Sequence, residues 1–126
     1  SQKIKDRSGD ITLSYIRYPA LKNPETATTL IFISGGPGQL NYLHSPYLMK
    51  LRDQYSLVFY DSRGTGKSVL NLEDAQNLAV INTENGVRDL DAVINAVSPK
   101  RPVFLWGHSY GGIVAKAYSA LHPHNV

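Results

Sequence analysis

The amino-acid sequence predicts a three-layer α/β fold, in which a mostly parallel sheet with antiparallel N-terminal strands carries helices on both faces. Three nearly continuous apolar runs have the character of strands buried on both sides. A run with alternating apolar and polar residues precedes them, as in a half-buried strand. Helical periodicity lies between these runs and after the last one. This alternation of strand and helix favours parallel pairing.

The expected strands lie at residues 11–18, 29–33, 56–60 and 102–106. The first alternates apolar and polar side chains, which is typical of an antiparallel strand at the margin of a sheet. The other three are rich in β-branched and aromatic residues. We therefore expect these three strands to be buried on both faces.

A weak helix is expected near residues 45–54 and a clearer one near residues 85–97. The apolar residues of the clearer helix share one face: Val87, Leu90, Ile94 and Val97. Ser98 and Pro99 end it. A last helix follows the final strand, with apolar residues at helical spacing: Tyr110, Ile113, Val114, Ala117, Tyr118 and Leu121.

Composition excludes several classes of protein. The chain of 126 residues is 42% hydrophobic, enough for the core of one domain. Its net charge of +3 is scattered, so we expect neither a nucleic-acid nor a membrane partner. The absence of cysteine excludes disulfides, thiolate catalysis and cysteine-ligated zinc. We expect no metal and no cofactor, and a soluble protein for which the cytoplasm is the favoured compartment.

The sequence Gly-His-Ser-Tyr-Gly at residues 107–111 follows the last strand and opens the last helix. This is the G-x-S-x-G pattern of a nucleophile elbow, in which a strained turn exposes a serine hydroxyl. Ser109 is therefore the predicted nucleophile, and Gly107 and Gly111 let strand and helix approach without Cβ clashes. The alternative is a plain turn in which the serine only caps the helix.

An acyl-transfer site also needs main-chain N–H groups directed at the developing oxyanion. The N–H of Tyr110, at the start of the helix, is the first expected donor. A second glycine-rich turn, Ser-Gly-Gly-Pro-Gly at residues 34–38, follows the strand at 29–33. Gly36 is the expected second donor, and a plain tight turn is the alternative for this loop.

A third motif, Asp-Ser-Arg-Gly-Thr-Gly-Lys-Ser at residues 61–68, ends like a phosphate-binding P-loop. A P-loop needs a glycine where this sequence has Asp61, whose carboxylate would repel phosphate. We therefore interpret the motif as structural. Asp61 and Arg63, with Gly64 and Gly66, are expected to fix a turn at a strand end near the active cleft.

These motifs together resemble the α/β-hydrolase superfamily, and most closely its proline iminopeptidase-like branch. Residues 35–38 are similar to that family's H-G-G-P-G, residues 61–68 to its D-x-R-G-x-G-x-S, and residues 82–90 to its next helix. The resemblance runs from about Thr28 onward. It implies an α/β-hydrolase-type sheet, Ser109 as nucleophile, and an oxyanion hole formed by the backbones of Gly36 and Tyr110.

The sequence departs from this family at two points. Ser34 stands where the family usually has histidine, and the elbow reads G-H-S-Y-G-G where iminopeptidases more often have G-G-S-W-G. The hydrolase class is compatible with both departures, whereas a peptide substrate does not follow from the motifs.

In this fold the acid and the base of the catalytic triad follow the serine along the chain. After Ser109 the sequence has His122 and His124 but no carboxylate. His122 is expected roughly 20 Å from Ser109 along the helix axis, at ~1.5 Å per residue, beyond the reach of proton transfer. We therefore expect residues 1–126 to be the N-terminal part of one α/β-hydrolase domain, truncated after the elbow helix and inactive alone.

The predicted function is that of a serine hydrolase that cleaves an ester or amide bond of a small-molecule or peptide substrate. The resemblance favours aminopeptidase activity like that of proline iminopeptidase. A non-catalytic hydrolase-fold module that binds a ligand is the alternative, and a nucleotide-binding domain is the weakest hypothesis. A complementary C-terminal fragment, or a second copy of the chain, is expected to cover the exposed edge of strand 102–106.

Overall fold

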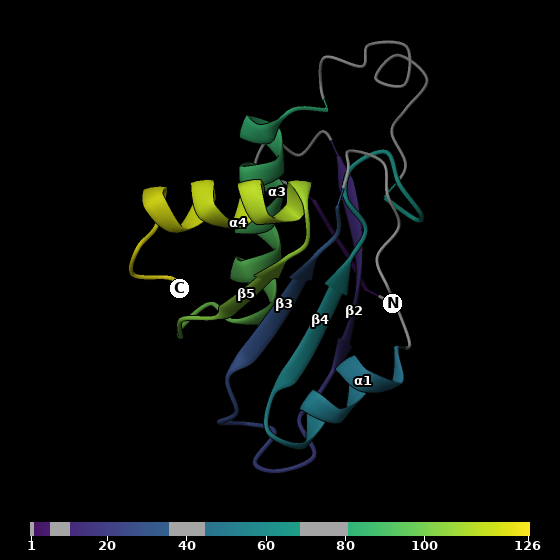
Figure 1. Ribbon diagram of the computed structural model, residues 1–126, viewed down its shortest axis with the longest axis vertical. Coiled ribbons are helices and arrows are strands. Elements are labelled where there is room, and N and C mark those ends of the chain that lie inside the picture. Colours follow the sequence, from purple (N-terminus) through teal and green to yellow (C-terminus); the bar gives the residue numbers. More distant parts are fainter. Residues whose placement is uncertain (1, 6–10, 36–44, 69–80) are drawn as a thin grey trace.

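The computed structural model describes residues 2–5, 11–35, 45–68 and 81–126. Within them, five strands form one sheet in the order β1-β2-β4-β3-β5 (Figure 1). The strands are β1 (Gln2–Lys5), β2 (Thr12–Tyr18), β3 (Thr29–Ile33), β4 (Ser56–Tyr60) and β5 (Phe104–Gly107). β2 is antiparallel to β1 and β4, whereas β3 is parallel to β4 and β5. The sheet is therefore mixed, and its N-terminal strands are antiparallel as predicted.

The helices agree with the predicted ones in order, and differ in their ends. The predicted helix at 45–54 is α-helical only in α1 (Pro46–Met49) and continues as the 3-10 helix η1 (Lys50–Asp53). α3 (Thr83–Val97) begins before the predicted residue 85 because Asn82 caps it. The side chain of Asn82 accepts a 2.8 Å hydrogen bond from the Asn85 N–H. α4 (Tyr110–Leu121) follows β5 directly.

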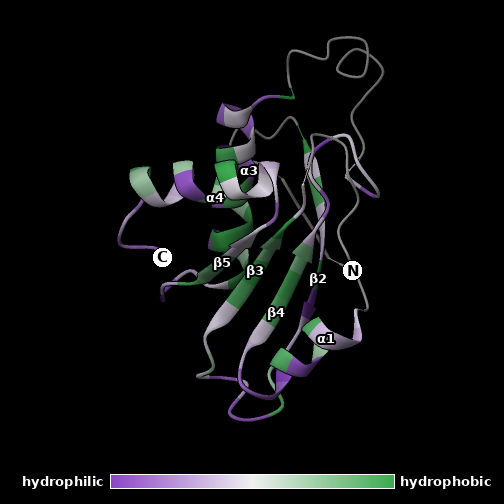
Figure 2. Cartoon of the chain, viewed as in Figure 1, coloured by the Kyte–Doolittle hydropathy of each residue, from purple (hydrophilic) through white to green (hydrophobic). Residues whose placement is uncertain are grey.

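The side chains of β3 and β4 alternate between two apolar clusters on opposite faces of the sheet. Ile31, Ile33, Val58 and Tyr60 belong to the cluster that includes residues of α3 and α4. Leu30, Phe32, Leu57 and Phe59 form the other cluster, against which α1 and η1 pack. Every residue of β3 and β4 is buried, and both strands are predominantly hydrophobic (Figure 2). The predicted helices on both faces are confirmed.

Two predictions about the sheet are wrong. The strand predicted at its margin is β2, which lies between β1 and β4, so β1 forms the margin. β5 was expected to be buried on both faces, yet Phe104 and Trp106 are 51% and 44% exposed. β5 pairs only with β3 among the described residues, and the apolar side chains on one of its faces are not covered there.

The apolar face of α4 is narrower than its periodicity suggests. Val114 and Tyr118 are buried against the sheet side, as expected, but Ile113 and Leu121 are exposed. These two side chains lie on the flank of α4 that no described element covers.

Candidate active site

Ser109 occupies the sharp turn between β5 and α4 and has φ 54° and ψ −119°. Positive φ is unfavourable for a residue with a side chain, and strain of this kind is concentrated at functional sites. Ser109 is exposed. Its side chain makes no capping hydrogen bond to α4 among the described residues, which disfavours the interpretation of Ser109 as a simple helix cap. The predicted strained and exposed position of Ser109 is confirmed.

Gly107 and Gly111 allow the close approach that this turn requires. A Cβ atom on Gly107 would clash with the backbone of Gly111 and Gly112. A Cβ atom on Gly111 would clash with the carbonyl oxygens of Ile33 and Ser34 at the end of β3. The turn is closed by hydrogen bonds of 2.9 Å from the Gly111 N–H to the His108 carbonyl and from the Gly112 N–H to the Ser109 carbonyl.

Tyr110, the predicted oxyanion donor, is the first residue of α4. The N–H groups of a helix's first turn have no acceptor within the helix, and the helix dipole favours negative charge there. The Tyr110 N–H is therefore suited to an oxyanion beside Ser109. Gly36, the second predicted donor, lies outside the described residues, but the strand that precedes its loop ends beside the elbow. The His108 N–H donates a 3.2 Å hydrogen bond to the Ile33 carbonyl at this point.

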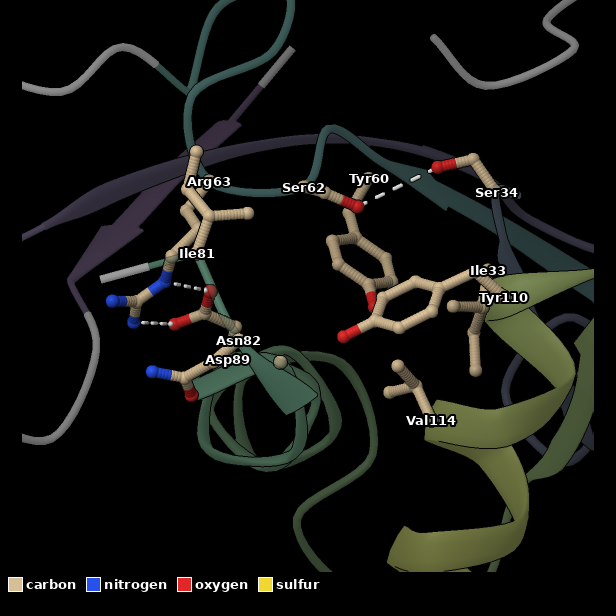
Figure 3. Close-up of a pocket in the computed structure, with 11 residues that line it drawn as sticks. Ile33, Ser34, Tyr60, Ser62, Arg63, Ile81, Asn82, Asp89, Tyr110 and Val114 are labelled. Atoms are coloured by element: carbon tan, nitrogen blue, oxygen red, sulfur yellow. Dashed lines mark hydrogen bonds and ion pairs between the residues drawn. The ribbon is translucent and has the colours of Figure 1, made fainter. Parts of the chain in front are cut away.

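A small cavity of about 30 Å³ lies behind the elbow, between the sheet and the starts of α3 and α4. Figure 3 shows that the side chains of Tyr60 and Tyr110 line it, with Ser34 and Ser62 at its upper rim. The hydroxyls of Ser34 and Ser62 are 3.5 Å apart. Burial raises the pKa of the Tyr60 hydroxyl, and the nearby Asp89 and Tyr110 add to the increase, so Tyr60 keeps its proton at neutral pH.

The motif at residues 61–68 forms a glycine turn after β4. Gly64 and Gly66 have φ 77° and 49°, which glycine adopts without strain. The Asp61 carboxylate accepts a 3.0 Å hydrogen bond from the Lys67 N–H. The Ser68 hydroxyl accepts one of 2.8 Å from the Ser14 N–H of β2. Because residues 65 and 68 pair as an isolated bridge and Lys67 lies in the turn between them, the turn differs from a P-loop.

Arg63, which was expected to fix this turn, also connects the turn to α3. Its Nε and Nη2 donate hydrogen bonds of 2.7 and 2.6 Å to the two carboxylate oxygens of Asp89. Both side chains are buried. Asp89 and Thr83 were part of the resemblance to the family's helix, but no role was predicted for them. The signal that could have identified Asp89 was the need of a buried arginine for a counter-charge.

The two histidines downstream of Ser109 lie at the opposite end of α4. His122 is the C-terminal cap of the helix, and its ring stacks on Tyr118 with 4.6 Å between the ring centroids. His124 lies in the segment after the helix. Neither residue is near the elbow, in agreement with the expectation that neither is the base.

Within the described residues, no three His, Asp or Glu side chains gather in a group that could hold a metal ion. None of the helices described has the length and hydrophobicity of a membrane span.

Comparisons with known proteins agree with this geometry. A family model described as serine aminopeptidase, S33, matches residues 26–126. The proline iminopeptidase of Thermoplasma volcanium is 31% identical over 109 residues, which is 83% of this chain and 34% of the relative. The monoglyceride lipase of Rattus norvegicus is 33% identical over 102 residues, 78% of this chain and 32% of the relative. The chain thus spans about a third of the length of these relatives.

Solved structures show the same fold. An epoxide hydrolase from Vigna radiata superimposes with a TM-score of 0.79 at 21% identity, over 99% of this chain and 35% of that chain. An α/β hydrolase from Novosphingobium aromaticivorans gives 0.79 at 15% identity, over 99% of this chain and 40% of that chain. At such low identity these structures show the fold alone. The family match over residues 26–126 shows that this chain belongs to the serine aminopeptidase S33 family, and its fold is that of the α/β-hydrolases.

Proposed function

We propose that Ser109 is the nucleophile of a serine hydrolase that cleaves an ester or amide bond through an acyl-enzyme intermediate. The observation that carries the proposal is the conformation of Ser109. Its φ of 54° is unfavourable for serine, and its exposed side chain makes no capping hydrogen bond among the described residues. A helix cap does not need a strained backbone. A nucleophile whose hydroxyl is held exposed at a sharp turn accounts for the strain.

In the proposed reaction, the Ser109 Oγ attacks the carbonyl carbon of the substrate and a base removes the hydroxyl proton. The negative charge that forms on the carbonyl oxygen accepts hydrogen bonds from the Tyr110 N–H and, as we propose, from the Gly36 N–H. The base then returns the proton to the leaving group, and water hydrolyses the acyl-enzyme. His122 and His124 lie at the other end of α4 from the elbow. We therefore assign the base and its carboxylate to a part of the protein outside residues 1–126.

Aminopeptidase activity is the subclass that we favour. Its support is the family description and the relatives named as proline iminopeptidases. The relative named as a monoglyceride lipase makes an ester substrate the second candidate.

A fluorophosphonate probe tests the proposal, because it forms a covalent bond only with an activated serine. We expect the whole protein to be labelled at Ser109 and the Ser109→Ala variant not to be labelled. Ser119→Ala is the matched control, since Ser119 lies on α4, the helix that Ser109 precedes, and its hydroxyl donates to the Ala115 carbonyl at 2.8 Å. If the whole protein is folded and remains unlabelled, the proposal fails and a non-catalytic binding module becomes the better hypothesis.

A further inference from the structure

The side chain of Tyr110 connects the elbow to the start of a second helix. Its hydroxyl lies 2.9 Å from the hydroxyl of Thr83, and either group can donate the hydrogen bond. Thr83 is the first residue of α3, and Tyr110 is the first residue of α4. The same residue therefore carries the proposed oxyanion donor on its backbone and a contact to α3 on its side chain.

Thr83 is itself held in place by several contacts of α3. Asn82 caps the helix directly before it through the 2.8 Å hydrogen bond to the Asn85 N–H. The buried pair of Arg63 and Asp89 attaches α3 to the turn after β4 through two hydrogen bonds. α3 also packs closely on α4, since a Cβ atom on Gly86 would lie 3.4 Å from a methyl group of Val114. The start of α3 is thus a fixed support for the Tyr110 side chain.

We propose that the hydrogen bond between Thr83 and Tyr110 positions the oxyanion donor of this enzyme. This inference depends on the proposed function, because it needs Ser109 to be a nucleophile and the Tyr110 N–H to face the oxyanion. A side chain held at both its Cα atom and its hydroxyl restricts the orientation of the peptide group between Ser109 and Tyr110. Small errors in the placement of a catalytic group lower the rate even where binding is unaffected. Thr83 and the hydroxyl of Tyr110 are therefore positioning groups that touch no substrate.

Three substitutions in the whole protein remove or keep this one hydrogen bond. Tyr110→Phe removes one hydroxyl, Thr83→Val removes the other at nearly constant volume, and Thr83→Ser keeps it. Hydrolysis of p-nitrophenyl acetate gives kcat and KM, and the rate of fluorophosphonate labelling gives the reactivity of Ser109. We expect the first two variants to lose roughly 3- to 10-fold in kcat and in labelling rate, the size of one neutral hydrogen bond, with KM unchanged. Thr83→Ser should retain the wild-type values.

The double variant shows whether the two hydroxyls act through one hydrogen bond or contribute to the rate independently. If both hydroxyls act through one bond, Tyr110→Phe combined with Thr83→Val should lose no more than either single variant. Tyr47→Phe is the control, because the Tyr47 ring lies on α1 and is 81% exposed. Each of three results would overturn the inference. These are wild-type rates in Tyr110→Phe, fully additive losses in the double variant, and a loss in Thr83→Ser as large as in Thr83→Val. An unlabelled wild-type protein would instead overturn the proposed function, and the inference with it.

Discussion

Two glycines of the elbow, Gly111 and Gly112, are neighbours in the chain but have different surroundings. Gly111 faces the carbonyl oxygens of Ile33 and Ser34, which a Cβ atom would strike. A Cβ atom on Gly112 would lie 3.6 Å from the Gly107 carbonyl oxygen, which is an ordinary van der Waals distance. Both glycines are within α4. Close packing therefore requires glycine at position 111, whereas position 112 has room for a Cβ atom.

Alanine substitutions should show this difference in the free energy of unfolding. We expect Gly111→Ala to destabilise the protein by about 1–3 kcal/mol, because the new methyl group forces backbone atoms of β3 and α4 apart. Gly112→Ala should stabilise it by about 0.5–1 kcal/mol, since alanine loses less conformational freedom in a helix. Urea denaturation followed by circular dichroism measures both. Equal effects of the two substitutions would contradict the close packing at Gly111.

At the scale of secondary-structure elements, α3 is attached to the turn after β4 by a buried charged pair and also carries an exposed pair. Arg63 and Asp89 form the buried pair across two elements. Glu84 and Arg88 form the exposed pair, with a distance of 2.7 Å but with side chains that are 75% and 61% exposed. The two pairs have similar N–O distances, so the difference in their burial should decide how much each contributes to the free energy of unfolding.

Removing one member of each pair tests this argument. Asp89→Asn leaves the Arg63 charge buried without its counter-charge, and we expect a loss of about 3–5 kcal/mol in the free energy of unfolding. Arg88→Ala breaks a solvent-screened pair one helical turn apart, and about 0.3–0.5 kcal/mol is expected. Chemical denaturation of both variants provides the comparison. A loss of similar size in the two variants would show that the Arg63–Asp89 pair contributes little more than a surface pair.

The same elements show which features a sequence can predict. The elbow was predicted because its constraints are local: an apolar strand, two glycines and a serine within one turn. The capped start of α3 was missed by two residues, although Asn82 is a favourable cap. The partners of Arg63 and Tyr110 were not predicted, since Asp89 and Thr83 are distant in sequence and meet these residues only after the helices pack. β1 was missed as a separate strand because its short sequence, Gln-Lys-Ile-Lys, has no apolar run.

At the scale of the whole molecule, the two sides of the sheet end differently. β1 closes one side of the described sheet, and β5 lies at the other side (Figure 1). A hollow of about 280 Å³ lies on the less covered face near the end of β5, lined mainly by apolar side chains that include Phe32, Leu48 and Trp106. Exposed apolar side chains on a strand with unpaired backbone groups favour association with another chain or segment. We propose that a complementary segment of the protein, or a second copy of the chain, covers this edge.

Residues 1–126 produced alone should therefore associate through β5. We expect the sedimentation coefficient to increase with protein concentration, because pairing at the edge buries Phe104 and Trp106. Phe104→Lys should abolish the increase, since a lysine on an edge strand opposes pairing with another strand. Tyr47→Lys, on α1, should leave it unchanged, and circular dichroism should show the same secondary structure in all three chains. A single monomeric species at every concentration would show that this edge does not promote association.

Trp106 is the only tryptophan of the chain, so its fluorescence reports on the same edge. Iodide should quench it strongly in the Phe104→Lys chain and more weakly as the unsubstituted chain associates.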